Sequence, residues 1–189
     1  MSPSLHSDDL PHPETGIILF TSGSLGEPKA VQLGRTGLLY LVDSLIEYFQ
    51  LGRETQATIT LPIFHTMALN TQFFPTFLAG GVCEFINTEL SMGKLYRHIS
   101  NSNGNFIALI GDMLKFCLEE KQKRNLTPAY NVQNIQLSGG ITRQEHLEWA
   151  SELFPNARIH KGFGLTECIR ISMISSLSAK FCFKFCSKL

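Results

Sequence analysis

Short apolar runs alternate with segments of helical period along most of this chain. Six runs have the length of β-strands: 17–20, 57–61, 82–86, 106–110, 134–137 and 157–160. Five segments carry apolar residues at helical spacing: 36–49, 67–78, 90–99, 113–124 and 142–154. Strands that alternate with helices pair mostly in parallel and are covered by helices. The pattern therefore predicts an α/β fold, a parallel-sheet-rich subdomain with helices on both faces.

Cap and breaker residues predict where several helices begin and end. Thr36 is the expected N-cap of the first helix, and Gly52 is its expected stop. The helix over 67–78 has to accommodate Pro75, which lacks a backbone N–H. Thr142 and Glu145 have the spacing of a capping box at the start of the last helix.

The composition is that of a folded domain without net charge. The chain has 189 residues, of which 43% are hydrophobic and only 17% are charged, so extended disorder is not expected. Lys+Arg and Asp+Glu both number 16, and this balance argues against nucleic acid as the main partner. The apolar excess indicates that part of the surface faces something absent from this chain.

Targeting and cysteine signals are weak. No stretch reaches the roughly 18 apolar residues of a membrane span. Residues 1–15 form a polar tail rather than a signal peptide, so we expect a cytoplasmic protein. The five cysteines are widely spaced and form no CxxC pair or Cys/His quartet. Reduced, mostly buried thiols are therefore expected rather than zinc ligands or disulfides.

The last residues, 177–189, form an atypical basic and aromatic tail. They carry three lysines, no acids and the alternating residues Phe181, Phe183 and Phe185. Two interpretations are open, an amphipathic edge strand or a segment foreign to the ancestral fold. The chain ends in SKL at 187–189, a peroxisomal import signal in eukaryotes, so a peroxisomal location is an alternative to the cytoplasm.

The strongest local signal is the segment TSGSLGEPK at 21–29, which follows a predicted strand. Its glycines allow close backbone approach, and its hydroxyls, amides and lysine can surround phosphate oxygens. A Walker A loop does not fit, because Pro28 precedes the lysine and Ala30 stands where Ser or Thr should hold magnesium. On its own, the segment is also compatible with an ordinary surface loop.

Three further motifs follow in order: PIFH at 62–65, SGG at 138–140 and GFGLTE at 162–167. Together with the first segment they resemble the adenylate-forming superfamily, which includes acyl-CoA synthetases, luciferase-like enzymes and the adenylation domains of peptide synthetases. Four matches in the right order are more specific than any one of them. The resemblance implies a partial AMP-binding (adenylation) domain over 16–176, a fragment of the large domain of these enzymes.

The resemblance also implies a role for each motif residue. The phosphate-binding positions are Thr21, Ser22, Gly23, Ser24, Gly26 and Lys29. The other nucleotide-binding positions are Gly139, Gly140, Gly162, Phe163 and Gly164, with Phe163 stacked on the base. Thr166 is expected to hydrogen-bond the α-phosphate and Glu167 to hold Mg²⁺, which favours oxygen ligands. His65 is expected beside the acyl carboxylate and the thiol entrance, although a hydrogen-bonded core histidine explains it almost as well.

The implied reaction has two steps. A carboxylic acid and ATP give an acyl-adenylate and pyrophosphate, and a thiol of CoA or of a phosphopantetheine carrier protein then takes the acyl group. Family members are much longer, and their ribose-binding aspartate and lid lysine have no counterpart here. We therefore expect an incomplete ligase core that completes no turnover alone. The alternative is a non-catalytic remnant that binds nucleotide weakly or a protein partner, and the missing lysine and aspartate are the features that favour it. Leu25, Ala30, Ile141 and Lys161 depart from the family pattern, which suggests relaxed constraint or a divergent branch.

Overall fold

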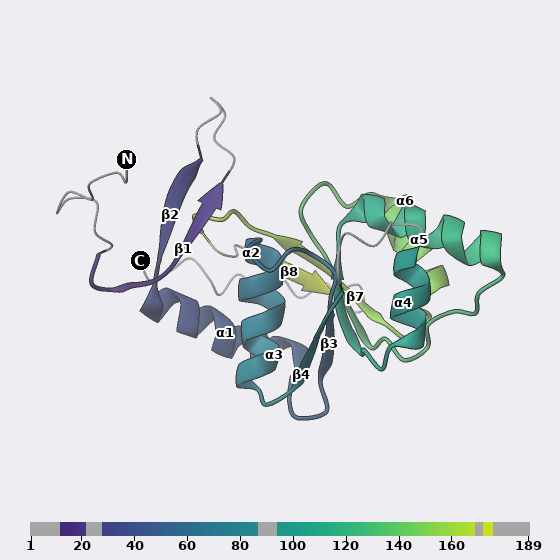
Figure 1. Cartoon of the computed structure of the whole chain (residues 1–189), viewed down its shortest axis with the longest axis horizontal. Helices are drawn as coiled ribbons and strands as arrows, with labels where there is room; N and C mark the ends of the chain where they lie inside the picture. The colour runs from purple at the N-terminus through teal and green to yellow at the C-terminus, as the bar shows by residue number, and fades with distance from the viewer. Residues whose placement is uncertain (1–11, 22–27, 87–93, 169–171, 176–189) are drawn as a thin grey trace, which may run out of the picture.

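A six-stranded sheet with helices on both faces forms the body of the molecule, and a two-stranded hairpin precedes it (Figure 1). The computed structural model describes residues 12–21, 28–86, 94–168 and 172–175. The strands are β1 (Thr15–Thr21), β2 (Lys29–Gly34), β3 (Gln56–Ile59), β4 (Val82–Phe85), β5 (Phe106–Leu109), β6 (Asn134–Leu137), β7 (Arg158–Phe163) and β8 (Ser172–Ser175). The helices are α1 (Arg35–Phe49), α2 (Thr66–Ala68), the π-helical turn η2 (Leu69–Phe73), α3 (Phe74–Leu78), α4 (Leu95–Asn101), α5 (Gly111–Arg124) and α6 (Gln144–Leu153).

The large sheet has the order β4-β3-β5-β6-β7-β8. Neighbours from β4 to β7 pair in parallel, and β8 runs antiparallel to β7. All four residues of β5 are buried, as expected for a central parallel strand that helices cover on both faces. The predicted α/β fold with a parallel-sheet-rich core is confirmed.

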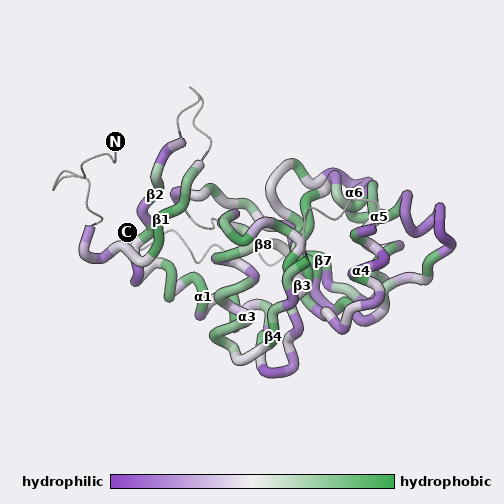
Figure 2. The backbone as a smooth tube through the Cα atoms, viewed as in Figure 1, coloured by the Kyte–Doolittle hydropathy of each residue, from purple (hydrophilic) through white to green (hydrophobic). Residues whose placement is uncertain are grey.

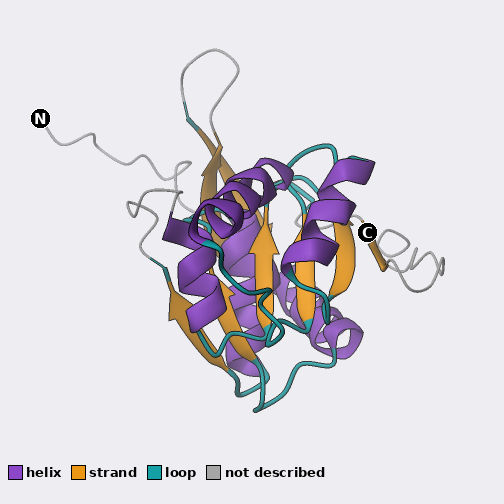
Figure 3. Cartoon of the chain, turned by 90° about the vertical axis from the view of Figure 1, so that its right-hand side faces the viewer, coloured by secondary structure: helices purple, strands orange, loops and turns teal. Residues whose placement is uncertain are grey.

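Two groups of helices cover the sheet. Helices α1, α2 and α3 lie on one face, and α4, α5 and α6 lie on the other (Figures 1 and 3). On the first face, Leu45 and Phe49 of α1 pack with Ala57, Phe106 and Met173. The hydropathy of the backbone follows this arrangement, because hydrophobic residues gather where the strands run and hydrophilic residues line the outer parts of α5 and α6 (Figure 2).

The first helix begins and ends at other residues than predicted. Its N-cap is Gly34 rather than Thr36, because the segment before it is a second strand that runs to Gly34. It ends before Gln50, which takes the left-handed conformation with φ 55° and closes the helix ahead of Gly52. Strand β2 is absent from the sequence prediction, which ended the loop at Lys29 and assigned no element to residues 30–35.

The predicted capping box is wrong as well. Helix α6 begins at Gln144 with Arg143 as its N-cap, so Thr142 lies outside the helix. The Arg143 N–H donates to Nδ1 of His146 over 3.3 Å. The buried ring of His146 thus supplies the acceptor that was assigned to Glu145.

Pro75 is accommodated by a change of helix type rather than by a break in the chain. The π-helical turn η2 lies directly before α3, and Pro75 occupies the first turn of α3. A proline is tolerated there because the first N–H groups of a helix have no partner within it. The helical prediction over 67–78 is confirmed as three consecutive segments.

The described thiols differ in exposure. Cys83, Cys117 and Cys168 are all free, but only Cys117 is fully buried and Cys168 is exposed. The expectation of mostly buried thiols is therefore wrong for Cys168. Over the described ranges, no helix combines the length and the apolar character that crossing a bilayer requires.

Candidate nucleotide site

The carboxyl edge of the parallel sheet collects three of the four predicted motifs. The chain leaves β3 toward β4 on one side and reaches β5 on the other, so the strand order reverses between β3 and β5. Open α/β sheets bind ligands at the carboxyl ends of strands beside such a reversal. His65 follows β3, Gly139 follows β6 and Phe163 ends β7. All three therefore lie at this one edge.

The SGG segment is held by a hydrogen bond to the GFG segment. The Ser138 hydroxyl donates to the carbonyl oxygen of Gly162 over 2.7 Å. The Ser138 N–H also donates to the carbonyl of Leu109 over 3.3 Å, which continues the pairing of β5 and β6 beyond their ends. Two motifs that lie 24 residues apart are thus fixed against each other.

The structural requirement for glycine differs between the two positions of this segment. Gly139 has φ +84°, a conformation that other residues rarely adopt. At Gly140 an added Cβ would meet no atom within 4 Å. The fold itself thus requires a glycine at 139 and leaves open space beside 140.

The GFGLTE segment begins inside a strand. Gly162 and Phe163 belong to β7, where they pair with Met173 and Ser172 of β8. The sequence prediction ended this strand at 160, so β7 extends into the motif. The Phe163 ring is 60% exposed, although aromatic rings of this size are usually buried. An exposed ring on a rigid strand is available to stack on a ligand.

Thr166 and Glu167 lie in the turn after β7. The turn is closed by a hydrogen bond from the Cys168 N–H to the carbonyl of Leu165 over 3.2 Å. Glu167 is exposed, and among the described residues no basic side chain forms an ion pair with it. Its carboxylate oxygens are hard donors of the kind that Mg²⁺ accepts, so the residue fits a magnesium ligand.

His65 has one ring nitrogen engaged. Nδ1 accepts a hydrogen bond from the Met67 N–H over 3.2 Å and thereby caps α2. Partial burial lowers the pKa of His65, so the ring is neutral at pH 7 and its proton sits on Nε2. The residue is thus both a local cap and a neutral hydrogen-bond donor at the edge of the sheet. Next to it, the Phe64 side chain is 75% exposed.

The predicted phosphate loop connects the two strands of the hairpin. Strands β1 and β2 are antiparallel, and Thr21 faces Lys29 across them. Thr21 is half-buried and Lys29 is exposed. The hairpin therefore holds both ends of the loop together. The other predicted members, Ser22, Gly23, Ser24 and Gly26, lie outside the described residues.

His160, which had no assigned partner, has a structural role. The ring of His160 lies between the Tyr48 hydroxyl and the Asn134 side-chain oxygen, each 3.1 Å away. Burial, and then the charge of Arg158, lower the pKa of His160 to about 4. Polar and apolar residues that alternate in a strand usually face opposite sides, so the sequence carried no signal that His160 is buried beside Ile159. Ser138 was also missed as a positioning residue, although it belongs to the SGG motif.

The model of the family described as "AMP-binding enzyme" matches residues 5–182. The chain belongs to this family of AMP-binding enzymes. Among curated relatives, a probable CoA ligase of Humulus lupulus is 26% identical over 158 residues, which cover 82% of this chain and 28% of the relative. A D-alanine–D-alanyl carrier protein ligase of Listeria innocua is 23% identical over 172 residues, which cover 86% of this chain and 33% of the relative. This AMP-binding chain thus spans about a third or less of either relative.

Solved structures share the fold of this AMP-binding chain. The adenylation domain AlmE of Vibrio cholerae, in complex with glycyl-adenosine-5'-phosphate, superposes with a TM-score of 0.75 at 17% identity. The match covers 93% of this chain and 32% of that protein. The described architecture is therefore that of a part of the large domain of adenylate-forming enzymes.

Proposed function

We propose that this chain supplies the ATP- and AMP-binding core of an acyl-adenylate-forming ligase. The observation that carries the proposal is the carboxyl edge of the sheet. There, the bond from Ser138 to Gly162 joins the glycine segment after β6 to the end of β7, which carries the exposed ring of Phe163. Membership of the AMP-binding enzyme family supports the same ligand.

In this proposal the nucleotide lies along the carboxyl edge. Adenine rests on Gly139 and Gly140, where the open space beside Gly140 accommodates a flat ring. Phe163 stacks on the base, with Gly162 and Gly164 on either side of it in the chain. Thr166 hydrogen-bonds the α-phosphate. Stacking and close backbone approach together favour a planar base over a bulky, non-planar group.

The phosphates extend toward the hairpin. Thr21 and Lys29 hold the ends of the loop, and Ser22, Gly23, Ser24 and Gly26 wrap the β- and γ-phosphates between them. Glu167 holds Mg²⁺, which neutralises part of the phosphate charge when it is bound. Fixed donors and charges of this kind catalyse by positioning and by stabilising charge.

The proposed chemistry is the formation of an acyl-adenylate. A carboxylate oxygen of the acid forms a bond to the α-phosphorus of ATP, and the bond to the bridging oxygen breaks to release pyrophosphate. The thiol of CoA or of a carrier's phosphopantetheine then displaces AMP from the acyl carbon. The neutral His65 donates from Nε2 to the acid's carboxylate and orients it.

A second candidate is a remnant that binds nucleotide or a protein partner without catalysis. Exposed apolar side chains favour it, because Ile141 is 84% exposed directly after the glycine segment. Apolar groups exposed at this level on a monomer often mark a surface that another chain covers. The two candidates share nucleotide binding and differ in turnover.

Calorimetric titration with Mg·ATP tests the shared claim. We expect saturable binding that Glu167→Ala weakens at least fivefold and that Glu148→Ala, a change of an exposed glutamate on α6, leaves unchanged. Removal of magnesium should weaken ATP binding by the parent chain and leave ATP binding by Glu167→Ala nearly unchanged. The proposal is contradicted if the folded parent chain does not bind Mg·ATP, or if Glu167→Ala binds it as tightly as the parent chain and Glu148→Ala do. Formation of acyl-CoA by the purified chain would rule out the remnant, and it would also contradict our expectation that this chain completes no turnover alone.

A further inference from the structure

A cavity of about 450 Å³ opens at the amino edge of the sheet, at the end opposite the nucleotide site. It is lined by the loop between α1 and β3 and by residues at the starts of β5, β6 and β7. Arg158 stands at the cavity end of β7 and Phe163 at the other end. A strand of this length separates the two sites by roughly 17 Å. The volume lies within the range of small-molecule sites.

Two arginine residues line this cavity, and no described acidic side chain forms an ion pair with either of them. Arg53 and Arg158 both contribute to the wall, and among the residues that the structure describes neither forms an ion pair. Glu54 is the one carboxylate in the lining, so the cavity carries an excess positive charge. Guanidinium groups offer paired N–H donors that match the oxygens of phosphate and carboxylate.

Hydrogen bonds hold the walls of the cavity in place. The Asn105 side chain accepts from the Gln56 N–H over 2.9 Å and donates to the carbonyl of Glu54 over 2.8 Å. These two bonds tie the Arg53 loop to the start of β5. Asn156 donates to the carbonyl of Tyr130 over 3.0 Å, which fixes the loop before Arg158. A wall that is ordered before a ligand arrives costs less conformational entropy on binding.

We propose that this cavity binds a small molecule that carries a phosphate or a carboxylate group, held between Arg53 and Arg158. The neighbouring amides add neutral donors. Asn134, whose side-chain oxygen lies 3.1 Å from Nε2 of His160, also lines the cavity. The site is separate from the proposed nucleotide site and does not depend on it.

His160 gives an independent readout of this site. The positive charge of Arg158 is one of the two causes that lower the pKa of His160. An anion bound at Arg158 screens this charge, so the pKa of His160 rises on binding. A merely structural role of Arg158 would not produce this response to added anion.

The test is a nuclear magnetic resonance titration of the full chain with inorganic phosphate and, separately, with citrate. We expect saturable shifts of the Arg53, Arg158 and Asn156 signals and an upward shift of the His160 pKa. Arg53→Gln and Arg158→Gln should each weaken binding at least fivefold. Arg35→Gln, which replaces an exposed arginine at the start of α1, should change it less than twofold. The tighter of the two anions identifies whether phosphate or carboxylate is the preferred group.

The proposal is overturned if no saturable shift is seen up to about 20 mM anion, an affinity too weak for a specific site. It is also overturned if the shifts fall on Thr21 and Lys29 instead, or if both arginine variants bind as the parent chain does. Both arginines are exposed, so their replacement should leave the unfolding midpoint unchanged and the comparison valid. Mg·ATP binding, measured separately, reports on the nucleotide site and its outcome does not alter this result.

Discussion

The Ser138 hydroxyl and the Gly162 carbonyl oxygen lie 2.7 Å apart and join the two glycine motifs at the carboxyl edge of the sheet. Each motif alone is a short loop or strand end that could move independently. The bond makes them one surface, with Gly140 on one side and Phe163 on the other. The shape of the proposed base-binding surface therefore depends on the hydroxyl of Ser138, which bonds to the backbone of the other motif.

Ser138→Ala tests this dependence. The change removes the donor and leaves the Gly162 carbonyl without this partner, which should lower the free energy of unfolding by about 1 kcal/mol. Mg·ATP affinity should fall several-fold because the two motifs are no longer fixed together. Ser151→Ala, which removes an exposed hydroxyl bonded to Leu147 on α6, is the matched control. Equal nucleotide affinity in both variants would show that nucleotide binding does not depend on the bond from Ser138 to Gly162.

Substitutions at the two glycines should affect different properties, stability at Gly139 and nucleotide binding at Gly140. Gly139→Ala forces a non-glycine residue to φ +84° and should cost about 1 kcal/mol in unfolding free energy. Gly140→Ala meets no neighbouring atom, so stability should stay within about 0.5 kcal/mol. If adenine rests on Gly140, the added methyl group should still weaken nucleotide binding. Chemical denaturation and calorimetry on both variants make the comparison, and unchanged affinity in Gly140→Ala would contradict the proposed position of the base.

The stability of the chain should fall in mild acid because of His160. The pKa of this ring is about 4 in the folded chain and 6.5 when unperturbed. Between these two pH values the unfolded chain binds more protons, so protonation favours unfolding. The contribution of the neutral His160 ring to the free energy of unfolding is complete above pH 6.5. It decreases by up to about 3 kcal/mol as the pH falls toward 4.

Denaturation curves across this pH range should therefore separate His160→Gln from the parent chain. The variant should be less stable at pH 7 and should approach the parent as the pH decreases. His12→Gln, at an exposed position, should follow the parent curve. Parallel curves for His160→Gln and the parent would show that the ring is not held neutral by the fold.

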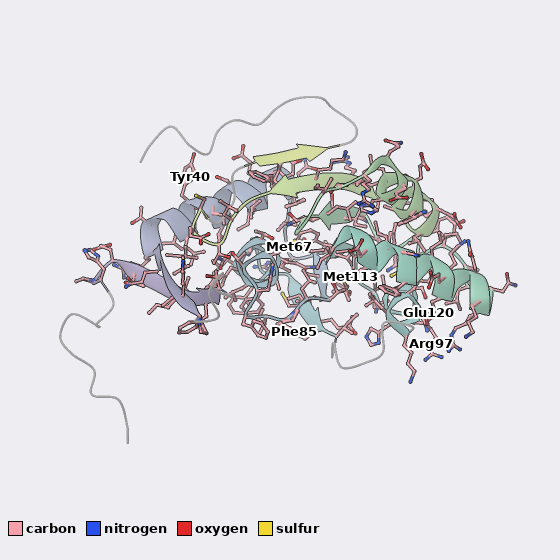
Figure 4. All side chains as sticks on the ribbon, turned by 90° about the horizontal axis from the view of Figure 1, so that it is seen from above. Tyr40, Met67, Phe85, Arg97, Met113 and Glu120 are labelled. Carbon is pink, nitrogen blue, oxygen red and sulfur yellow. The ribbon has the colours of Figure 1, made fainter. Side chains whose placement is uncertain are left out.

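Replacement of Glu120 should strongly destabilise the group of helices α4, α5 and α6. Its buried carboxylate accepts from the N–H of Tyr96 over 2.9 Å and from that of Arg97 over 3.4 Å, at the start of α4. Its other oxygen lies 3.7 Å from Nε of Arg124. Glu120 and Arg97 are labelled in Figure 4. Glu120→Ala removes these partners and should cost roughly 2 kcal/mol, measured by urea denaturation. Glu119→Ala, at the exposed neighbouring position, should cost less than about 0.5 kcal/mol.

Apolar periodicity predicted most of the elements because burial determines them. The four residues Asn134–Leu137 are both the predicted and the observed extent of β6, since three of them are buried. Strand β2 was missed because only Leu33 of its residues is buried, and a hairpin outside the main sheet leaves little apolar signal. Its pairing with β1 is what stabilises it.

Local cap residues were predicted less well than strands, because residue type alone does not determine which nearby side chain reaches the free N–H group. Thr142 looked like an N-cap by type, but the ring of His146 packs near Trp149 and receives the Arg143 N–H instead. Within the site, motif order indicated which residues to examine. The bond between Ser138 and Gly162 joins residues far apart in sequence and has no signature in a single chain.

Amide hydrogen exchange with and without Mg·ATP tests the central claim most directly, because it locates the bound nucleotide along the chain. The account predicts increased protection at 138–140 and 162–167, and at the two ends of the hairpin loop, Thr21 and Lys29. The amino-edge loop that contains Arg53 should be unaffected by nucleotide. Protection confined to that loop, or no change anywhere in a folded chain at saturating Mg·ATP, would contradict a nucleotide site at the carboxyl edge.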